Sequence, residues 1–517
     1  MNNKIISFGN KAYVAGLFMV ACSMALSKFG MSLGQFFILG GWLLSANFSD
    51  KWQQLKSNKT VVLLLIALFV IHLIGLVQTS DFQYAFNDIR IKLPLLLMPV
   101  LILSMPPLKI ITRNYLFHFI TVSVLISTLI SFGIYLGWSS IDVHDIRDIS
   151  PFISHIRLAL LVCVAMVLLY DDFKNNRRWM NLVMLLWFFF FLVLLQSLTA
   201  IIIIAAFVAL AMLNTFFDKS KSIFIRMIGG AGIISIVLAG GYFYKLIFVD
   251  SIKPIQVEKL KLLKYTRNGN TYYSLPERQD LENGHPVWIN ICDKELDEAW
   301  RERTGLSIYE YNQSGYQYYY TTVRFISSKG LSKDRNAVMS LSQKEINAIK
   351  NGCSNVEQIN HNGLGMRIKN LAWEYRQYFY NDYVSGQSFT QRIAYWSTGI
   401  KIFNSNWLTG VGTGDVNIAF KEQYKKDKSK LEEKWRLRTH NQYITLGIAF
   451  GVSGILLLMA VLFYPLVSDY KAAGFIFPSF ILIAAISMLS EDTLETQAGI
   501  TFFAFLYCLF WRERSVG

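Results

Sequence analysis

The chain has 517 residues, of which 53% are hydrophobic and only 16% are charged. Its mean hydropathy is +0.35, and its apolar residues fall in runs too long for the core elements of a soluble protein. These values exclude an ordinary soluble enzyme. The net charge of +15 does not indicate nucleic acid binding, because the Lys and Arg residues stand mostly at the ends of the apolar runs.

About twelve apolar runs are long enough to cross a bilayer, which predicts an all-α polytopic membrane protein. We expect nine transmembrane helices in residues 1–249 and three in residues 442–517, with a large mixed domain outside the membrane in residues 250–441. The predicted spans are residues 13–27, 31–46, 60–78, 93–105, 115–136, 152–170, 180–196, 198–217, 227–249, 442–467, 472–489 and 496–511.

The charges of the connecting segments predict the orientation. Basic residues gather in alternate connections, at residues 51–59, 109–113, 174–178, 219–226, 471 and 512–514. The intervening connections, such as residues 138–150 and 490–495, are acidic or poor in Lys and Arg. Because basic connections stay in the cytoplasm, both termini are predicted there and residues 250–441 on the outer side.

The outer domain is expected to combine strands and helices. Aromatic and β-branched residues follow one another around residues 316–325, which favours a few strands within residues 250–358. Two short helices are predicted, at residues 293–303 and 342–351. Residues 391–404 are predicted to form an amphipathic helix whose apolar stripe can lie along the membrane surface.

The five cysteines show no metal-binding spacing. Cys22, Cys163 and Cys508 lie in apolar runs, and Cys292 and Cys353 lie in the outer domain, with no CxxC pair and no Cys/His cluster. A structural zinc site is therefore not expected. Cys292 and Cys353 either form one disulfide on an oxidising side of the membrane or remain two thiols, and both alternatives stay open.

Three polar positions at the outer ends of apolar runs can carry chemistry. An enzyme facing outward has no ATP there, so it needs a substrate that is already activated, such as a lipid-linked diphosphate. Arginine forks bind phosphate oxygens well, and Arg157 and Arg392 stand at the outer end of the sixth span and the start of the amphipathic helix. His440, preceded by Arg436 and Arg438, stands at the mouth of the tenth span and can accept a proton near neutral pH.

Other features are weaker signals. The glycines of residues 408–415 allow a tight turn whose backbone N–H groups could face an anion. Asp415 and Glu491 either orient His440 or an arginine or are simply solvated carboxylates of a turn and a short loop, and Asn441 adds an amide beside His440.

Several of these segments, taken in order, resemble the O-antigen ligase and O-antigen polymerase family. The most specific are residues 391–396 (QRIAYW), 406–415 (NWLTGVGTGD) and 440–443 (HNQY). Further stretches are similar to ligase-type members from Bacteroidetes, namely residues 325–334 (FISSKGLSKD), 489–499 (LSEDTLETQAG) and the proline-containing 92–99. The resemblance implies a GT-C-type membrane fold with a periplasmic loop domain between late spans.

The resemblance also implies an activity. It implies transfer of a glycan from undecaprenyl diphosphate to lipid A-core, on the periplasmic side of the bacterial inner membrane, with inversion and without a metal ion or other cofactor. His440 and Arg392 then correspond to the family's catalytic residues. The expected diphosphate- and glycan-binding residues are Arg157, Arg438, Asp415, Asn441 and Glu491.

One departure from the family pattern affects the predicted site. Family members commonly carry an arginine where residues 196–200 of this chain place Leu198. A leucine side chain cannot bind phosphate, so we expect Arg157 to supply the missing charge from the neighbouring span, or the diphosphate to be held differently.

Three alternatives remain open. An O-antigen polymerase or a protein O-glycosyltransferase would use the same donor with another acceptor. A flippase for the lipid-linked sugar is less consistent with spans that hold few ionisable residues beyond His72, His118 and Arg157. A metal-dependent transferase would need Asp142, His144, Asp145 and Asp148 of residues 138–150 as ligands, although a solvated acidic loop explains them more simply.

Overall fold

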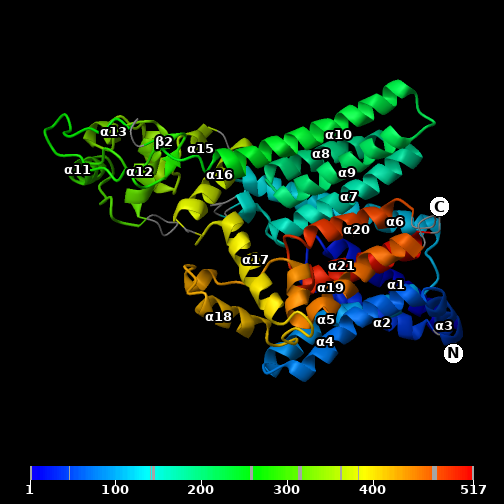
Figure 1. Cartoon of the computed structure of the whole chain (residues 1–517). Coiled ribbons are helices and arrows are strands. Elements are labelled where there is room, and N and C mark those ends of the chain that lie inside the picture. The colour runs from blue at the N-terminus through cyan, green and yellow to red at the C-terminus, as the bar shows by residue number, and fades with distance from the viewer. Residues whose placement is uncertain are drawn as a thin grey trace. The chain divides into compact units, whose positions relative to one another are not determined.

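A computed structural model describes residues 3–514, except residues 46, 140, 142–145, 257–259, 312–316, 361–363, 382–383 and 469–473 (Figure 1). The chain is predominantly helical and divides into two compact units. The first, here called the bundle, comprises Met1–Gly230 and Arg392–Gly517. The second, here called the insert, comprises Ala231–Gln391.

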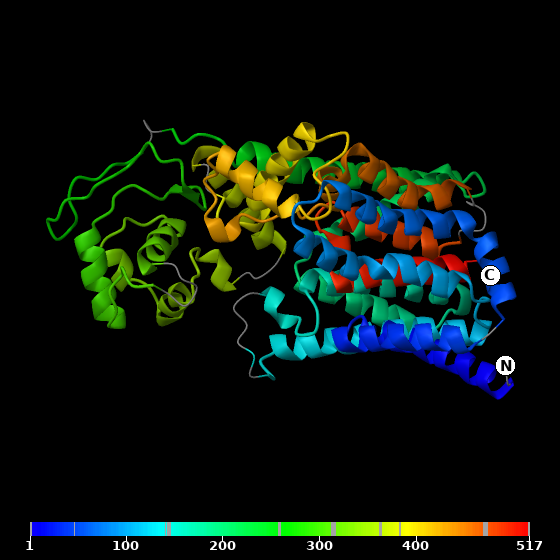
Figure 2. The same cartoon turned by 90° about the horizontal axis from the view of Figure 1, so that it is seen from below.

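Long apolar helices lie side by side in the bundle (Figures 1 and 2). The N-terminal part contains α1 Asn3–Ser23, α2 Lys28–Leu44, α3 Phe48–Ser57, α4 Lys59–Ile74, η1 Gly75–Gln78, α5 Phe82–Leu103, α6 Ile110–Tyr135, η2 Ile146–Ile149, α7 His155–Asn176, α8 Trp179–Leu194, α9 Leu198–Phe217 and α10 Ile223–Tyr244, the last of which continues into the insert. The C-terminal part contains α17 Ser388–Ser405, which begins in the insert, then α18 Val416–Lys426, η5 Glu433–Trp435, α19 Gln442–Ser468, α20 Ile476–Ser487, η6 Thr493–Glu495 and α21 Gln497–Glu513.

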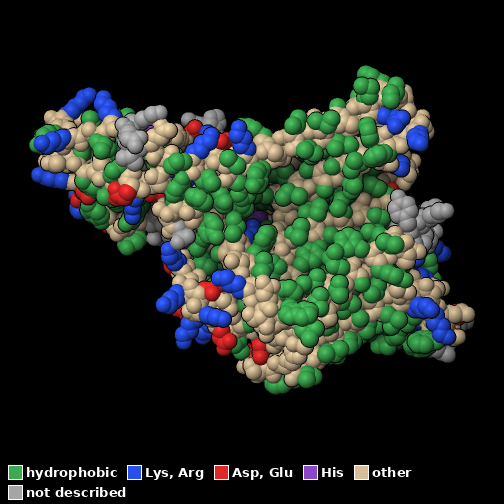
Figure 3. Space-filling model, in the orientation of Figure 1, with side chains coloured by type: hydrophobic (Ala, Val, Ile, Leu, Met, Phe, Trp, Pro, Cys, Tyr) green, Lys and Arg blue, Asp and Glu red, His purple; other side chains and the backbone are tan. Residues whose placement is uncertain are grey.

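Several of these helices can cross a membrane. Among the described residues, six pass a test of length and apolar composition, and the bent pair of α2 and α3 would make a seventh if it is one span. Only 11% of the apolar stretch in α9 is buried, so its side chains need an apolar surrounding such as lipid. Hydrophobic side chains also cover the visible side of the bundle (Figure 3). The chain is therefore a helical multi-pass membrane protein.

The predicted spans each fall largely on a helix, and that of residues 227–249 lies mostly in the insert. The number that crosses the membrane stays a prediction. The fourth predicted span is part of a longer helix, because α5 begins at Phe82. The start of α1 and the end of α21 lie at the same end of the bundle (Figures 1 and 2). This arrangement is what two termini on one side of the membrane require, while the identity of that side stays a prediction.

Short helices dominate the insert. They are η3 Lys245–Asp250, a π-helix, and then α11 Asp293–Thr304, α12 Tyr318–Ser328, α13 Arg335–Met339, α14 Gln343–Lys350, α15 Glu357–Asn360 and α16 Leu364–Asn381. The strands β1 Leu281–Glu282 and β2 His285–Pro286 pair antiparallel, with Leu281 opposite Pro286. Trp300, Phe325 and Ile346 are fully buried in its apolar core.

The helices predicted at residues 293–303 and 342–351 are confirmed by α11 and α14, and Ser342 caps α14 in a capping box with Glu345. The strands predicted around residues 316–325 are wrong, because α12 covers Tyr318–Ser328. Tyr319, Val323 and Ile326 recur at spacings of four and three, so one face of a helix buries them all in the core.

The predicted outer domain is not one compact body. The boundary between the units lies at Gln391, so Arg392 and the residues up to Asn441 pack with the bundle helices. The helix predicted at residues 391–404 is confirmed by α17. The bundle therefore contains, on one rigid support, every residue that was predicted to act in the site.

Candidate active site

A cavity of about 730 Å³ lies at one end of the bundle. Its walls come from α7, α18, the segment before α19, and the loop between α20 and α21, here called the 488–496 loop. The lining residues are Arg157, Asn417, Phe420, Lys421, Tyr424, Lys425, Glu433, Arg436, Leu437, Arg438, His440, Glu491, Asp492, Glu495 and Thr496. Basic and acidic side chains both line it, so the charges can hold one another in place as well as face the cavity.

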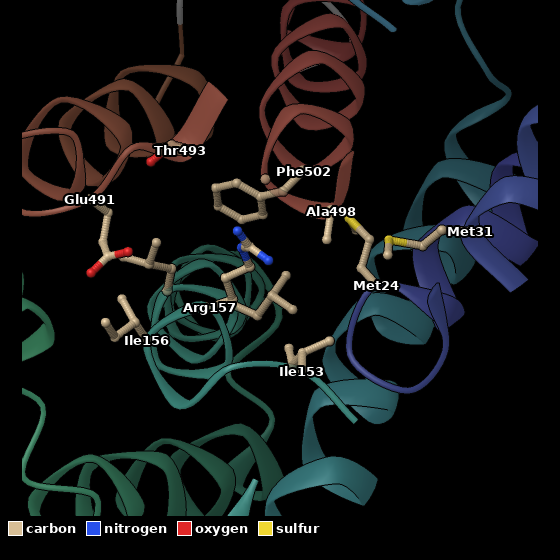
Figure 4. A pocket seen from close by; sticks show the side chains of 12 residues that line it. Met24, Met31, Ile153, Ile156, Arg157, Glu491, Thr493, Ala498 and Phe502 are labelled. Carbon is tan, nitrogen blue, oxygen red and sulfur yellow. The ribbon is translucent and has the colours of Figure 1, made fainter. Parts of the chain in front are cut away.

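Arg157 reaches this cavity from the first turn of α7. Ser154 caps that helix, and the Arg157 guanidinium donates to the hydroxyl of Thr496, the N-cap of α21. Figure 4 shows the guanidinium beside the ring of Phe502, where it also borders a small apolar cavity that reaches Met24. The apolar contact with Phe502 positions the Arg157 guanidinium. The N–H groups that Thr496 does not accept can bind an anion in the larger cavity.

Arg392 is joined to the cavity through Glu491. Near the start of α17, its Nη2 lies 3.1 Å from Oε1 of Glu491, and Glu491 lines the cavity with Arg157. Burial raises the pKa of Glu491, and the two arginines lower it only in part. Glu491 therefore forms an ion pair with Arg392 and also feels the charge of Arg157.

His440 lies directly before α19, with its backbone in the left-handed conformation (φ 49°). Its ring faces that of Tyr395, with 5.8 Å between the ring centres. Burial lowers the pKa of His440, and Arg392 and Arg438 add to this effect while Asp492 opposes it. The imidazole is therefore mostly neutral at pH 7, which is the form that accepts a proton.

Asp492 is a site residue that was not predicted from the sequence. It lines the cavity, and its Oδ1 accepts a hydrogen bond from the hydroxyl of Thr445, 2.8 Å away. Burial raises the pKa of Asp492, while Arg438 and His440 lower it. The sequence does contain an acidic run at residues 491–495. Several carboxylates stand in that run, and the sequence does not say which of them acts on His440.

Arg438 is fixed by a buried network of charges. Its Nη1 donates to the hydroxyl of Tyr84 at 2.6 Å, and its Nη2 lies 3.2 Å from Oε2 of Glu495. Nζ of Lys92, a fully buried side chain, also lies 3.2 Å from Oε2 of Glu495 and forms an ion pair with Asp88. Burial raises the pKa of Glu495, but the two cations outweigh burial and hold it below its ordinary value.

The glycine-rich segment of residues 408–415 is not an anion-binding turn. The N–H of Val411 donates to the carbonyl oxygen of Ile448 at 2.9 Å, and that of Gly412 donates to Ala449 at 3.0 Å. Gly410 has φ 75°, and a Cβ there would lie 2.2 Å from the Ala449 oxygen. The glycines let this segment approach α19, and their N–H groups are used in that contact.

Two of the predicted site residues, Asp415 and Asn441, lie outside the cavity and form hydrogen bonds with backbone groups. The Asp415 carboxylate accepts the backbone N–H groups of Ser80 and Asp81, with distances of 2.9 Å. Asn441 is buried and donates to the carbonyl oxygen of Leu489 at 3.0 Å. The structure brings together Arg157, Arg392, Arg438, His440 and Glu491 of the predicted set, and it leaves Asp415 and Asn441 with structural contacts.

Leu198 begins α9 close to this site. The next residue, Thr199, forms a hydroxyl–hydroxyl hydrogen bond of 3.0 Å with Ser490 of the 488–496 loop. The family's arginine position and Arg157 thus belong to two helix starts that face the same loop. This placement favours Arg157 as the residue that supplies the missing charge.

The sequence alternatives on metals and thiols have different outcomes. Within the part of the chain that the structure describes, no group of three or more His, Cys, Asp and Glu residues could hold a metal ion. Asp142, His144 and Asp145 lie outside the described residues, so that alternative metal site is not tested. All five cysteines are free thiols, including Cys292 and Cys353, so the disulfide alternative is not formed.

The apolar helices and the charged cavity define a multi-pass membrane protein with a polar site at one end of its helical bundle. A family model described as O-antigen ligase matches residues 344–459, a range that contains Arg392, Arg438 and His440. This match supports an assignment to the O-antigen ligase family. Comparison with curated proteins gives no significant match.

Proposed function

We propose that this protein transfers a glycan from undecaprenyl diphosphate to lipid A-core, as an inverting and metal-independent O-antigen ligase. The observation that carries the proposal is the meeting of Arg157, Arg438 and His440 around one cavity, from helices far apart in the sequence. The family match supports an O-antigen ligase-type activity in general, and the donor and acceptor are part of the proposal.

The arginines act on the leaving group in this proposal. The bond between the anomeric carbon and the diphosphate oxygen breaks, and negative charge builds on the diphosphate. Arg157 and Arg392 bind the diphosphate, and Arg438 faces the same cavity with its guanidinium fixed by Glu495. Fixed guanidinium groups stabilise such charge without having to reorganise, which is why their buried partners matter.

His440 acts on the acceptor. An acceptor hydroxyl attacks the anomeric carbon from the face opposite the diphosphate, and the neutral imidazole of His440 takes the hydroxyl proton. The proton then passes to solvent, and undecaprenyl diphosphate leaves. Asp492 stabilises the protonated imidazole by its charge, because it is the acidic group that raises the pKa of His440.

Two alternatives keep this site but change the acceptor, namely a polymerase that extends a carrier-linked glycan and a protein O-glycosyltransferase. In each case the reaction faces the periplasm, at the inner membrane of a bacterium, and both termini lie in the cytoplasm. A flippase would move the donor without cleaving it, so release of undecaprenyl diphosphate separates the enzyme class from the transporter class.

The test is transfer by purified protein, with undecaprenyl diphosphate-linked glycan and lipid A-core in EDTA. We expect one glycan joined to each lipid A-core by the wild type, and loss of the product in His440→Ala and Arg392→Ala. Matched controls are His285→Ala and Arg301→Ala, which change exposed side chains of the insert. Full activity of Arg392→Ala at normal expression would overturn its assigned role.

The products also distinguish the alternatives. Longer carrier-linked glycans without joined lipid A-core would identify a polymerase and keep the site. Activity that EDTA abolishes and a divalent cation restores would identify a metal-dependent enzyme and contradict the proposed mechanism.

A further inference from the structure

The insert contains a second cavity, of about 390 Å³, whose lining residues all belong to the insert. Its lining includes side chains with hydrogen-bonding groups, among them Glu282, Arg324, Asn355, Gln358, Asn370 and Trp373. The site proposed above involves no residue of this cavity. Its volume falls in the range of pockets that bind small molecules or short oligomers.

One face of α16 forms a wall of this cavity. Lys369, Asn370, Trp373 and Arg376 all line it, and their spacings of three and four residues place them on one side of a helix. A helix face is a rigid support, so groups carried on it keep fixed relative positions. The wall presents an indole, an amide and two cations, and so combines one flat apolar surface with several hydrogen-bonding groups.

The lining beside α16 is a fixed set of planar polar side chains. Nε of Arg324 lies 2.7 Å from Oε1 of Glu282, and Nδ2 of Asn355 donates to Oε2 of the same carboxylate at 2.9 Å. The Arg324 guanidinium also lies over the Trp373 ring, 3.9 Å from its centre. These contacts order the polar groups before any ligand arrives, which reduces the entropy lost on binding.

Two hydrogen-bond donors of the α16 wall have no acceptor. Nε1 of Trp373 is buried and donates to no group in the described part of the chain. Asn370 uses its oxygen to accept from Gln358, and its Nδ2 forms no hydrogen bond within the same residues. The buried Trp373 donor is costly to leave without an acceptor, so a ligand that brings an oxygen to it gains binding energy, and the partly exposed Asn370 amide can donate to a second oxygen.

The charges of the lining favour an uncharged ligand. Three cations, Arg324, Lys369 and Arg376, face three carboxylates, Asp250, Glu282 and Glu357. This balance provides no excess charge for a phosphate or an amine. A sugar ring offers oxygen acceptors, hydroxyl donors and an apolar C–H face, which match the amides, the carboxylates and the indole of this cavity.

We propose that this cavity binds sugar units of the glycan and so holds part of the chain that is transferred. The proposal rests on the proposed function, because the glycan is the substrate there. It gives the insert the role of a glycan-binding subsite, with Trp373 and Asn370 as its binding residues.

The experiment measures binding of lipid-free polysaccharide to the full-length protein. The probe is the polysaccharide released by mild acid from the lipopolysaccharide of the bacterium that encodes the protein, tritium-labelled, in equilibrium dialysis. Variants are Trp373→Ala, Trp373→Phe and Asn370→Ala, and the last two remain informative if the first does not fold. Tyr320→Ala is the matched control, because Tyr320 is half exposed on the same unit but does not line the cavity.

We expect wild-type binding that weakens by about tenfold or more in Trp373→Ala and Asn370→Ala, with an intermediate loss in Trp373→Phe, which keeps an aromatic ring but lacks the indole N–H donor. Tyr320→Ala should bind like wild type, and so should His440→Ala, although it loses transfer. In transfer assays Trp373→Ala should raise KM for long glycan donors and leave kcat nearly unchanged.

Absence of wild-type binding at millimolar polysaccharide would overturn the proposal, and so would binding that the cavity variants do not weaken. Loss of binding in Tyr320→Ala alone would place the glycan at Tyr320 instead of in the cavity. These failures differ from failure of the proposed function, which is absence of donor cleavage by a protein that still binds the polysaccharide.

Discussion

Replacement of Lys92 by methionine should be strongly destabilising, although Lys92 lies outside the cavity. Its side chain is fully buried, and its Nζ contacts both Asp88 and Glu495. Arg438 remains beside Glu495 in the variant, so the group that loses its cation is Asp88. The variant must then bury a carboxylate without a partner or protonate it.

Two estimates of the free energy of unfolding lost in Lys92→Met agree. Removal of one partner from a buried ion pair costs about 3–5 kcal/mol. Protonation at pH 7 of a carboxyl group with an ordinary pKa near 3.9 costs about 4 kcal/mol, at about 1.4 kcal/mol for each pH unit. If Asp88 folds protonated, the folded variant binds one proton more than the unfolded chain. The destabilisation therefore grows as the pH rises from 5 to 7 and shrinks as it falls.

The assay is the midpoint of thermal unfolding in detergent, followed by tryptophan fluorescence at pH 5 and pH 7. Lys92→Met should unfold well below wild type at pH 7, and Lys92→Met with Asp88→Leu should regain most of the loss because the unpaired carboxylate is gone. Lys401→Met is the matched control. It breaks an exposed ion pair with Asp427 and should cost less than about 1 kcal/mol. A double variant that is no more stable than Lys92→Met would refute the reasoning.

Three further predictions follow from the site and its surroundings. Asp415→Ala should lower the unfolding midpoint by an amount that corresponds to about 1–3 kcal/mol, because two backbone N–H groups lose their charged acceptor. Donor turnover per folded molecule should stay the same. Loss of turnover without loss of stability would instead place Asp415 in the site. Burial lowers the pKa of His440, so the acid limb of the pH–rate profile should lie below about pH 6.5. Asp492→Asn removes the group that opposes this shift and should move the limb to lower pH, whereas movement toward neutral pH would contradict the electrostatics. Cys292 and Cys353 should both react with a maleimide after unfolding without reductant, and protection of the pair would show a disulfide.

Much of the bundle could be predicted because apolar runs are a local signal. Length and hydropathy alone locate a helix, whereas the contacts between helices depend on the whole fold. Arg157, Arg392 and His440 stood out for the same reason, as polar side chains at the ends of apolar runs. The ion pair between Arg392 and Glu491 joins residues 99 positions apart, and no local pattern contains that information.

The errors have physical causes in particular residues. Alternating aromatic residues favour a strand, yet Tyr319, Val323 and Ile326 also share one face of a helix. Packing of that face against the core of the insert stabilises the helix α12 instead of a strand. Glycine-rich turns bind anions only when their N–H groups are free. In this chain the carbonyl oxygens of Ile448 and Ala449 in α19 accept those of Val411 and Gly412, which the sequence of the turn cannot reveal.

The resemblance implies an arginine where this chain has Leu198, and its absence raises the question of which residue supplies that charge. An anion responds to charge at a place in space, whichever helix supplies it. The starts of α7 and α9 both contact the 488–496 loop, through the bonds from Arg157 to Thr496 and from Thr199 to Ser490. Both helix starts therefore contact the loop whose residues line the cavity. Residues 196–200 lack the arginine that the resemblance implies, and Arg157 of α7 lines the cavity. The departure in sequence is therefore compatible with our proposal that Arg157 supplies the charge.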